Sequence, residues 1–288
     1  MSIVLQQALL AGLLTGMFYA LIAVGFALIF GVVRVFNLAH GEFIVIAGYI
    51  SFWLWSLKGV DPLLSIPISM FLLSIIGGSI KKIMDGVKEP FELNTIVFTF
   101  GLTLFLENLM LSLWSGDYRL ISASYIDQSI SILGVSTSLG RFLVFAVSLA
   151  AIALLHYFLK KTYVGLAMRA TSQERDAASL MGINVKRIDQ YSFSIGAALA
   201  GIAGPLFASI HYVYPSVGLE VTIIALVVTI FGGVGEIRGI VLGGLILGIS
   251  ESLTVAYLGF QWRELAGFAM LIILLLLRPY GLLGGRRY

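Results

Sequence analysis

Long, uninterrupted apolar runs are the feature that most constrains this chain. Stretches such as "FLVFAVSLAAIALLHYFL" and "LAGFAMLIILLLL" do not alternate polar with apolar residues, and similar runs follow one another along the 288 residues. In hydrocarbon, backbone groups cannot bond to water, so only helices and closed barrels cross a bilayer. A barrel strand would alternate over about ten residues. The chain is therefore predicted to be an all-α integral membrane protein.

Composition supports the same conclusion. The chain is 59% hydrophobic and 11% charged, with a mean hydropathy of +1.01, whereas soluble domains carry about 45–50% apolar and about 25% charged residues. Membrane lipid is thus the expected surrounding of most of the chain. The chain has no cysteine and its three histidines are far apart, so neither disulfides nor a metal site is expected. A net charge of +3, spread along the chain, argues against a nucleic-acid partner.

Nine apolar segments approach the roughly 20 residues that a membrane span requires. Three of them are only 15 residues long, which is typical of tilted, broken or partly inserted helices. We therefore predict a polytopic helical bundle of about eight to nine spans, with short or broken helices, in a single transmembrane domain over residues 1–288. The first segment lacks the positive n-region of a removable signal and is expected to be retained. The segments are 5–33, 43–57, 63–80, 94–114, 140–159, 190–211, 220–234, 239–257 and 264–278.

The distribution of Lys and Arg predicts the orientation, because cytoplasmic loops collect these residues. If the loop at about 160–189 is cytoplasmic and the sides alternate, 14 of the 18 basic residues lie inside and 4 lie outside. Arg286 and Arg287 belong to the inside set. The same alternation predicts an external loop at about 115–139, with the C-terminus inside and the N-terminus outside.

A short polar stretch, "GLAMRATSQERDAASLMGI" at 165–183, interrupts this apolar sequence. Thr171 and Glu174 have the spacing of a capping box, in which each side chain bonds a free N–H at a helix start. Asp176 would add negative charge to the first turn, where the helix dipole favours it. Gly182 would provide the left-handed residue that ends the helix.

The resulting helix, predicted from Ser172 to Met181, is too short to cross a membrane. Ala177, Leu180 and Met181 share one face, with Ala178 beside them. A ten-residue helix is marginal alone, so a surface must hold it. That surface is either the membrane domain of the same chain or a groove on a cytoplasmic partner. In the second case Ala177 and Ala178 are the expected contact residues, because small side chains allow close approach.

Glycine is dense within the last spans. Gly239 and Gly243, and likewise Gly244 and Gly248, have the spacing of close helix-packing faces. Lining of a translocation path is the alternative interpretation. The stretch "FGGVGEIRG" lacks the Gly-Lys-Ser/Thr ending of a phosphate-binding loop, and no nucleotide site is recognisable elsewhere in the sequence.

Ionisable residues within apolar runs are costly to bury and are therefore candidates for the translocation path. Glu107 and Glu251 could each serve either as a structural hydrogen-bonding group or in gating and passage. Glu42 is a further candidate for the path. Asn37 and His40, close to the glycine at 41, are typical of a broken helix that exposes backbone groups to a cavity. For this pair a structural role is favoured over direct contact with a transported molecule.

Four stretches, taken in order, carry a resemblance to a known family. "FNLAHGEF", "LAGIAGPLF", "RPYGLLG" and the polar stretch resemble the branched-chain amino-acid permeases of the LivH type, which belong to ABC importers. The resemblance covers nearly the whole chain. The polar stretch is similar to the coupling loop of these permeases at Thr162, Gly165, Ala167, Arg169, Ala170, Asp176, Ala177, Ala178, Met181, Gly182 and Ile183.

The resemblance implies a transport subunit rather than an enzyme, in a bacterial or archaeal cytoplasmic (inner) membrane. It implies a second homologous permease, as a heterodimer, two cytoplasmic ATPase subunits on the coupling helices, and an extracytoplasmic substrate-binding protein. ATP would be bound by the ATPase partners, so no cofactor is expected on this chain.

The expected cargo is a small amphiphilic solute, foremost a branched-chain amino acid. Urea or a short amide is an alternative within the same family. An ion-coupled secondary transporter would also explain buried carboxylates but would leave the polar cytoplasmic helix without a role. An intramembrane enzyme is disfavoured, because no nucleophile–base pair is recognisable.

Overall fold

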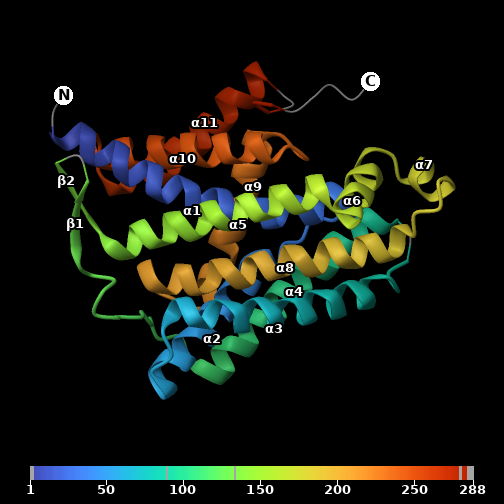
Figure 1. The fold of residues 1–288 in the computed structure, drawn as a ribbon, viewed down its shortest axis with the longest axis horizontal. Coiled ribbons are helices and arrows are strands. Elements are labelled where there is room, and N and C mark those ends of the chain that lie inside the picture. The colour runs from blue at the N-terminus through green and yellow to red at the C-terminus, as the bar shows by residue number, and fades with distance from the viewer. Residues whose placement is uncertain (1–2, 89, 133, 279–280, 284–288) are drawn as a thin grey trace. The chain divides into compact units, whose positions relative to one another are not determined.

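The computed structural model describes residues 3–88, 90–132, 134–278 and 281–283, and the chain is largely helical (Figure 1). Each of the nine predicted apolar segments coincides with a helix. The helices are α1 Ile3–Val33, α2 His40–Lys58, α3 Pro62–Met84, α4 Phe91–Trp114, α5 Leu139–Lys161, α6 Tyr163–Gln173, α7 Arg175–Leu180, α8 Val185–Ile210, α9 Gly218–Gly232, α10 Ile237–Tyr257 and α11 Arg263–Leu277, with 3-10 turns η1 Pro215–Val217 and η2 Phe260–Trp262.

Among the described residues, eight helices are long and apolar enough to cross a membrane. The predicted short segments in α9 and α11 reach that length because η1 and η2 extend them at their N-terminal ends. The ninth, α2, falls outside this set and carries His40 and Glu42 in its first turn. The prediction of eight to nine spans is thus confirmed, and α2 accounts for the difference.

The chain divides into two compact units. Helices α1, α5 and α9 contribute residues to both. The expected single domain over 1–288 stays a prediction. The first unit comprises Met1–Val24, Ser122–Ala150 and Ile224–Tyr288, and the second comprises Gly25–Ile121 and Ala151–Ile223.

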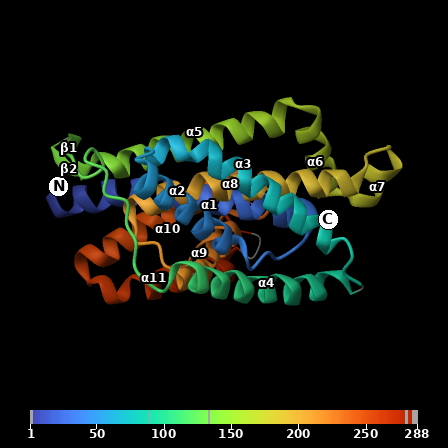
Figure 2. The ribbon, with the colours of Figure 1, turned by 90° about the horizontal axis from the view of Figure 1, so that it is seen from below.

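In the second unit, α8 is the central element and packs most extensively against α3 and then α2 (Figure 2). Small residues permit the close approach. A Cβ at Gly77 of α3 would lie 2.4 Å from the Cβ of Ala197, and a Cβ at Gly204 would lie 2.3 Å from that of Ala47 in α2. Side chains larger than these cannot be placed without moving a helix.

In the first unit, α10 packs against α1 through the predicted glycine faces. A Cβ at Gly248 would lie 2.5 Å from the carbonyl oxygen of Gly12, and one at Gly244 would lie 2.6 Å from that of Gly16. On the neighbouring face, a Cβ at Gly239 would lie 2.0 Å from the Gly232 carbonyl oxygen of α9. The prediction of helix-packing faces is confirmed.

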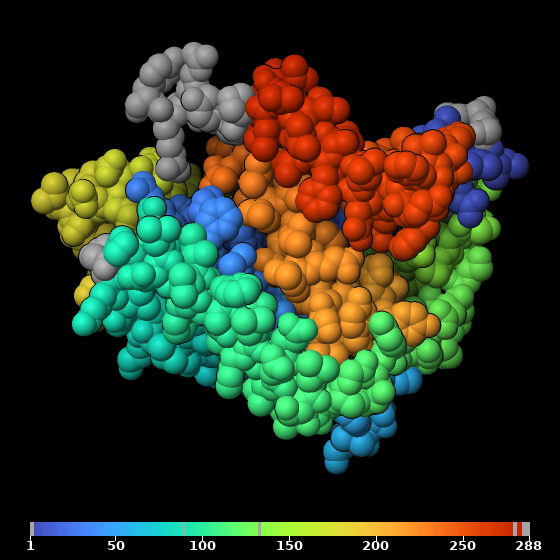
Figure 3. Space-filling model, turned by 180° about the vertical axis from the view of Figure 1, so that it is seen from behind, coloured from blue at the N-terminus to red at the C-terminus, as the bar shows by residue number. Residues whose placement is uncertain are grey.

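Helix α11 gives this unit an apolar, exposed surface. Helix α11, red in Figure 3, buries few of its side chains within the chain. Leu276 and Leu277 are 80% and 76% exposed, which suits a surface that faces lipid or another membrane subunit.

A short hairpin in the first unit was not predicted from the sequence. Strands β1 Ser129–Ile132 and β2 Val135–Ser138 pair antiparallel, with Ser129 opposite Ser138. Gly134, at φ +81°, occupies the turn. The hairpin lies inside the predicted external loop, where the sequence is too polar for a span.

Candidate functional site

The helical path is broken between α1 and α2. Helix α1 ends at Val33, Arg34 adopts a left-handed backbone at φ 59°, and α2 begins at His40. A left-handed arginine is uncommon, because its Cβ crowds the backbone. The predicted broken helix is therefore confirmed at residues 34–39.

The sequence predicted that the backbone groups of this break are exposed to a cavity. In the structure they are hydrogen-bonded by other helices instead. The Thr99 hydroxyl of α4 donates to the Phe36 carbonyl at 2.9 Å. The Thr222 hydroxyl of α9 lies 3.0 Å from the Leu38 carbonyl and accepts the Gly41 N–H at 2.8 Å. Threonines from two other helices cover the groups because the chain is packed closely here.

Two buried side chains, Asn37 in the break and Glu42 in the first turn of α2, have no hydrogen-bond partner among the described residues. Asn37 is 0% exposed and Glu42 is 1% exposed, and neither their amide atoms nor their carboxylate oxygens bond to any described residue. The Glu42 carboxylate lies against Gly218, where a Cβ would be 2.1 Å from Oε1. Unpaired buried polar groups are costly, so these two are the strongest candidates for a functional role in the second unit.

Two further candidates lie near them. Glu107 of α4 is half-buried and close enough to Glu42 for their charges to interact. His40 is buried and packs edge-on against the Phe26 ring, with the centroids 5.8 Å apart. The structure thus brings Glu42 and Glu107 together, and His40 has a packing role beside the break.

Glu251 differs from these residues because it is fully paired. In the first unit its Oε2 accepts from the Tyr19 hydroxyl at 2.9 Å and from Arg263 Nε at 2.8 Å. Arg263 also donates to the Tyr19 hydroxyl. The sequence left a structural and a passage role open, and this network of α1, α10 and η2–α11 supports the structural one.

The cytoplasmic loop predicted at about 160–189 begins with α6. The Thr162 hydroxyl caps this helix by accepting from the Gly165 N–H at 3.0 Å. A Cβ at Gly165 would lie 2.5 Å from the Phe158 carbonyl oxygen, so the chain can turn sharply out of α5 only with glycine there. The next motif residue, Ala167, is buried, whereas Arg169 is exposed and Ala170 is half-buried.

The predicted capping box is wrong. Thr171 lies inside α6 and is buried, and Glu174 has an extended backbone between α6 and α7 without a side-chain cap. Helix α6, which Thr162 caps, continues past the predicted start at Ser172. The predicted helix Ser172–Met181 is therefore replaced by the last turn of α6 and by the shorter α7.

The end of α7 follows the prediction. Asp176 lies in its first turn, and Gly182 is left-handed at φ +84°. The Ile183 N–H donates to the Ala178 carbonyl at 3.1 Å and the Gly182 N–H donates to the Ser179 carbonyl at 3.0 Å. These two bonds form a Schellman motif, which gives a six-residue helix a defined end.

The small residues of α7 do not share one exposed face. Ala178 is only 5% exposed and packs within this chain, whereas Ala177 is exposed. Leu180 and Met181 are 88% and 84% exposed. The interpretation of Ala178 as a partner-facing residue is therefore wrong, and the outward surface of this helix is apolar at its tip.

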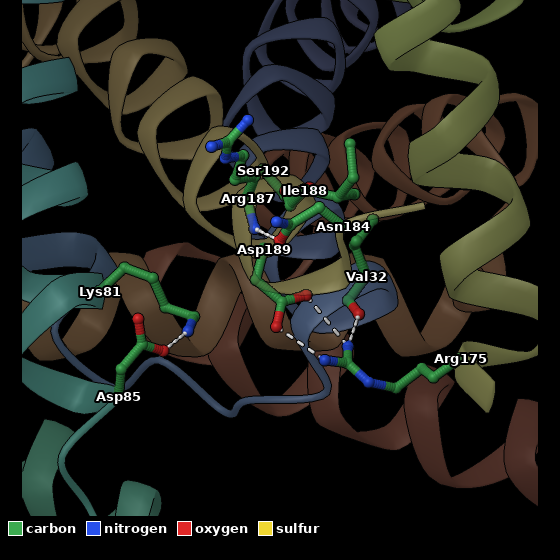
Figure 4. Close-up of polar contacts among 9 residues, drawn as sticks. All are labelled: Val32, Lys81, Asp85, Arg175, Asn184, Arg187, Ile188, Asp189 and Ser192. Atoms are coloured by element: carbon green, nitrogen blue, oxygen red, sulfur yellow. Dashed lines mark hydrogen bonds and ion pairs between the residues drawn. The ribbon is translucent and has the colours of Figure 1, made fainter. Parts of the chain in front are cut away.

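Arg175 of α7 makes a contact that the sequence did not suggest (Figure 4). Its guanidinium holds both carboxylate oxygens of Asp189 in α8, at 3.0 and 2.7 Å, and donates to the Val32 carbonyl of α1 at 2.7 Å. The same view shows Lys81 of α3 donating to Asp85. Arg175 and Asp189 are 14 residues apart, and Val32 is 143 residues away.

The predicted external loop is anchored at its start in the second unit. Arg119 lies over the rings of Trp53 and Phe52, with centroid distances of 5.0 and 5.4 Å, and pairs with Val213 in an isolated β-bridge. In the first unit, a cavity of about 390 Å³ lies between the hairpin and the N-terminal ends of α1 and α5. Gln7, Asp127 and Arg141 are among its polar lining residues.

Apolar membrane-spanning helices, a buried interruption between α1 and α2 and a polar helical loop together form the architecture expected of a membrane transport subunit. Comparison with known proteins specifies the family. Residues 8–277 match the family described as "Branched-chain amino acid transport system / permease component". The chain belongs to this family.

The relatives include two named permeases. The LivH permease protein of the high-affinity branched-chain amino acid transport system of Salmonella typhimurium is 32% identical, over 96% of this chain and 95% of the relative. BraD of Pseudomonas aeruginosa, from a system of the same description, is 34% identical over the same shares. Among solved structures, PsaBC from Streptococcus pneumoniae in complex with Fab shares the fold, with a TM-score of 0.50, 15% identity and coverage of 94% and 90%.

The motifs that suggested the family are partly visible in the structure. "FNLAHGEF" covers residues 36–39 of the break and the first turn of α2, the polar stretch covers most of α6 and all of α7, and "LAGIAGPLF" lies in the buried part of α8. Pro279, Tyr280 and Gly284 of "RPYGLLG", and also Arg286 and Arg287, lie outside the described residues. Gly281 packs its backbone against Gly233 in the first unit.

Proposed function

We propose that this chain is the membrane-spanning permease subunit of an ATP-binding-cassette importer for branched-chain amino acids, in a bacterial or archaeal cytoplasmic (inner) membrane. The names of the relatives support the cargo. The chain forms one half of the transport path, and ATP hydrolysis takes place on separate subunits. A second, homologous permease completes the path as a heterodimer, and an extracytoplasmic protein delivers the solute.

One observation carries the docking of the ATPase subunits. Buried residues such as Ala167 and Ala178 hold the loop at 160–189 on its own chain, yet Leu180 and Met181 are 88% and 84% exposed at the end of a helix that is fixed by a Schellman motif. Two large apolar side chains on a rigid tip suit insertion into a groove of a partner protein. The coupling surface is therefore Ala177, Leu180 and Met181, supported by Gly165, Asp176 and Gly182.

The docking is tested by co-purification of the ATPase subunits in mild detergent. Replacing Leu180 and Met181 together with Asp should abolish the association while the permease still accumulates in the membrane. The matched control is Leu258→Asp, because Leu258 is 64% exposed in another loop. Normal ATPase recovery with the doubly substituted α7 would refute docking at this helix.

The orientation follows from the charge distribution and can be measured in the same cysteine-free chain. A single cysteine at Ser172, away from the tip of α7, should react with a membrane-impermeant thiol reagent only after the cells are opened. A cysteine at Ser124, in the predicted external loop, should react in intact cells. Labelling of Ser172→Cys from outside would reverse the orientation.

The cargo is tested by uptake into proteoliposomes that contain the whole importer. Leucine uptake that requires ATP and the binding protein supports the proposal. Uptake of urea or a short amide in place of leucine would favour the alternative within the family. Leucine uptake driven by an ion gradient without ATPase subunits would favour a secondary transporter.

A further inference from the structure

The last turn of α1 contains no basic side chain, and the arginine that follows it, Arg34, is exposed. The last four carbonyls of a helix have no partner within it, and the negative end of the helix dipole favours a nearby positive charge. Helix α1 has no basic residue in its last turn. Arg175, which is on α7, supplies this charge by donating to the Val32 carbonyl at 2.7 Å.

The same guanidinium is held in place by Asp189. Two nearly parallel bonds of 3.0 and 2.7 Å join the Arg175 side chain to this carboxylate, whose side chain is 7% exposed. A bidentate arginine–carboxylate pair fixes direction as well as distance. Lysine could not replace it, because an ammonium is a point charge and does not present a planar fork.

Arg175 therefore joins three elements of the second unit at one point (Figure 4). It lies in the first turn of α7, five residues before Leu180 at the exposed tip. Asp189 lies in α8, against which α2 and α3 are packed. Val32 is two residues before Arg34, the first residue of the break. The break contains Asn37 and is followed by α2 with Glu42 in its first turn. A displacement of α7 must consequently move the end of α1 or break these bonds.

We propose that Arg175 is the positioning residue through which a movement of α7 reaches the α1–α2 break. This inference rests on the proposed function, because it requires that ATPase subunits move α7. The Arg175–Asp189 pair keeps α7 and α8 together, and the bond to Val32 transmits the displacement to residues 34–39. Without the Arg175 guanidinium, α7 still binds the ATPase, but ATP hydrolysis no longer changes the conformation of the break.

The experiment uses the complete importer in proteoliposomes, with a single cysteine at the exposed Arg34 position as a reporter. In the otherwise unsubstituted protein, the labelling rate of Arg34→Cys should differ between the nucleotide-free and the ATP-bound complex. Arg175→Gln should retain the ATPase subunits and ATP hydrolysis, abolish this difference, and lower uptake about tenfold, within the 5–150-fold range of typical coupling between sites.

Two further variants make the result specific. Arg175→Lys keeps the positive charge but not the planar guanidinium, and it should lower the amount of solute moved per ATP less than Arg175→Gln does. If Arg175→Gln fails to accumulate in the membrane, Arg175→Lys serves as the test variant. Arg187→Gln removes an exposed charge in the first turn of α8, with no side-chain bond to the described residues, and should behave as the unsubstituted protein.

Three results would overturn the inference. The first is normal uptake by both Arg175 variants. The second is a labelling rate of Arg34→Cys that still depends on nucleotide in Arg175→Gln. The third is loss of the ATPase subunits from Arg175→Gln, because Arg175 would then only support α7. Failure of the unsubstituted permease to bind any ATPase would instead refute the proposed function. That measurement is made first, so the two failures are distinguishable.

Discussion

Two buried glutamates, one in each unit, have opposite surroundings. Glu251 in the first unit accepts bonds from Tyr19 and Arg263, so its charge is compensated. Glu42 in the second unit is even less exposed, yet its carboxylate has no hydrogen-bond partner among the described residues. From sequence the two look alike, since each is a single acidic residue in an apolar run.

The difference in hydrogen bonding predicts a structural role for Glu251 and a functional role for Glu42. A paired carboxylate contributes to holding its helices together, and its removal leaves the partner charge buried and uncompensated. An unpaired carboxylate contributes no such contact, so the fold gains nothing that explains its burial. We therefore expect variants of the first unit to change stability, and variants at the break to change transport.

The largest effect is expected from Glu251→Ala. The substitution leaves Arg263 without its carboxylate, and breaking a buried ion pair in this way typically costs about 3 kcal/mol or more. The thermal unfolding midpoint of the detergent-purified protein and its amount in the membrane should both fall. The comparison would be broken if the protein remained as stable as before but lost transport, because Glu251 would then belong to the path.

Glu264→Gln is the matched control for that experiment. Glu264 follows Arg263 directly but is exposed and makes no side-chain bond to the described residues. Its neutralisation should change the free energy of unfolding by less than about 0.5 kcal/mol, so the unfolding midpoint should stay the same. A drop as large as that of Glu251→Ala would show that net charge, and not the network, stabilises this region.

An intermediate effect is expected from Gly248→Ala in the packing face between α10 and α1. The added Cβ would lie 2.5 Å from the Gly12 carbonyl oxygen and 2.6 Å from Gly16 Cα, both backbone atoms that cannot rotate away. Overpacking of this kind costs about 1–3 kcal/mol. The matched variant Gly101→Ala, with open space around the new Cβ, should not lower the unfolding midpoint. Equal stability of both variants would contradict close packing as the role of Gly248.

Features that depend on neighbouring residues could be predicted from the sequence. Apolar runs located all nine long helices, and glycines four residues apart located the α10 packing faces. Gly182 was recognised because a left-handed helix end needs glycine at that place. These signals are local, so one sequence contains them in full.

Features that depend on where distant helices lie could not be predicted. Tyr19 and Glu251 are 232 residues apart, and only the fold brings them together. Thr171 failed as a cap because α6, which Thr162 caps, runs through it, so a valid local pattern was overridden by a longer helix. Ala178 failed as a docking residue because the rotation of so short a helix depends on what it packs against.

The smallest effect on stability, and the sharpest contrast with Glu251, is expected from Glu42→Gln. No hydrogen bond is lost, and a neutral amide is less costly to bury than a charge, so the free energy of unfolding should change by less than about 1 kcal/mol. Uptake of the cargo should nevertheless fall. If the carboxylate contacts the ammonium group of an amino acid, loss of that charge-assisted bond, about 1.5–3 kcal/mol, lowers uptake about tenfold or more.

Glu107→Gln shows whether the fall belongs to Glu42 or to the pair. Glu107 lies close enough to affect the charge of Glu42 but is only half-buried. Its replacement should therefore lower uptake less, through its effect on Glu42. Uptake is measured in proteoliposomes at equal permease content, alongside the unfolding midpoint. If Glu42→Gln destabilises the protein as strongly as Glu251→Ala while uptake per folded molecule stays normal, Glu42 is a structural residue, and the absence of a hydrogen-bond partner does not mark the transport path in this fold.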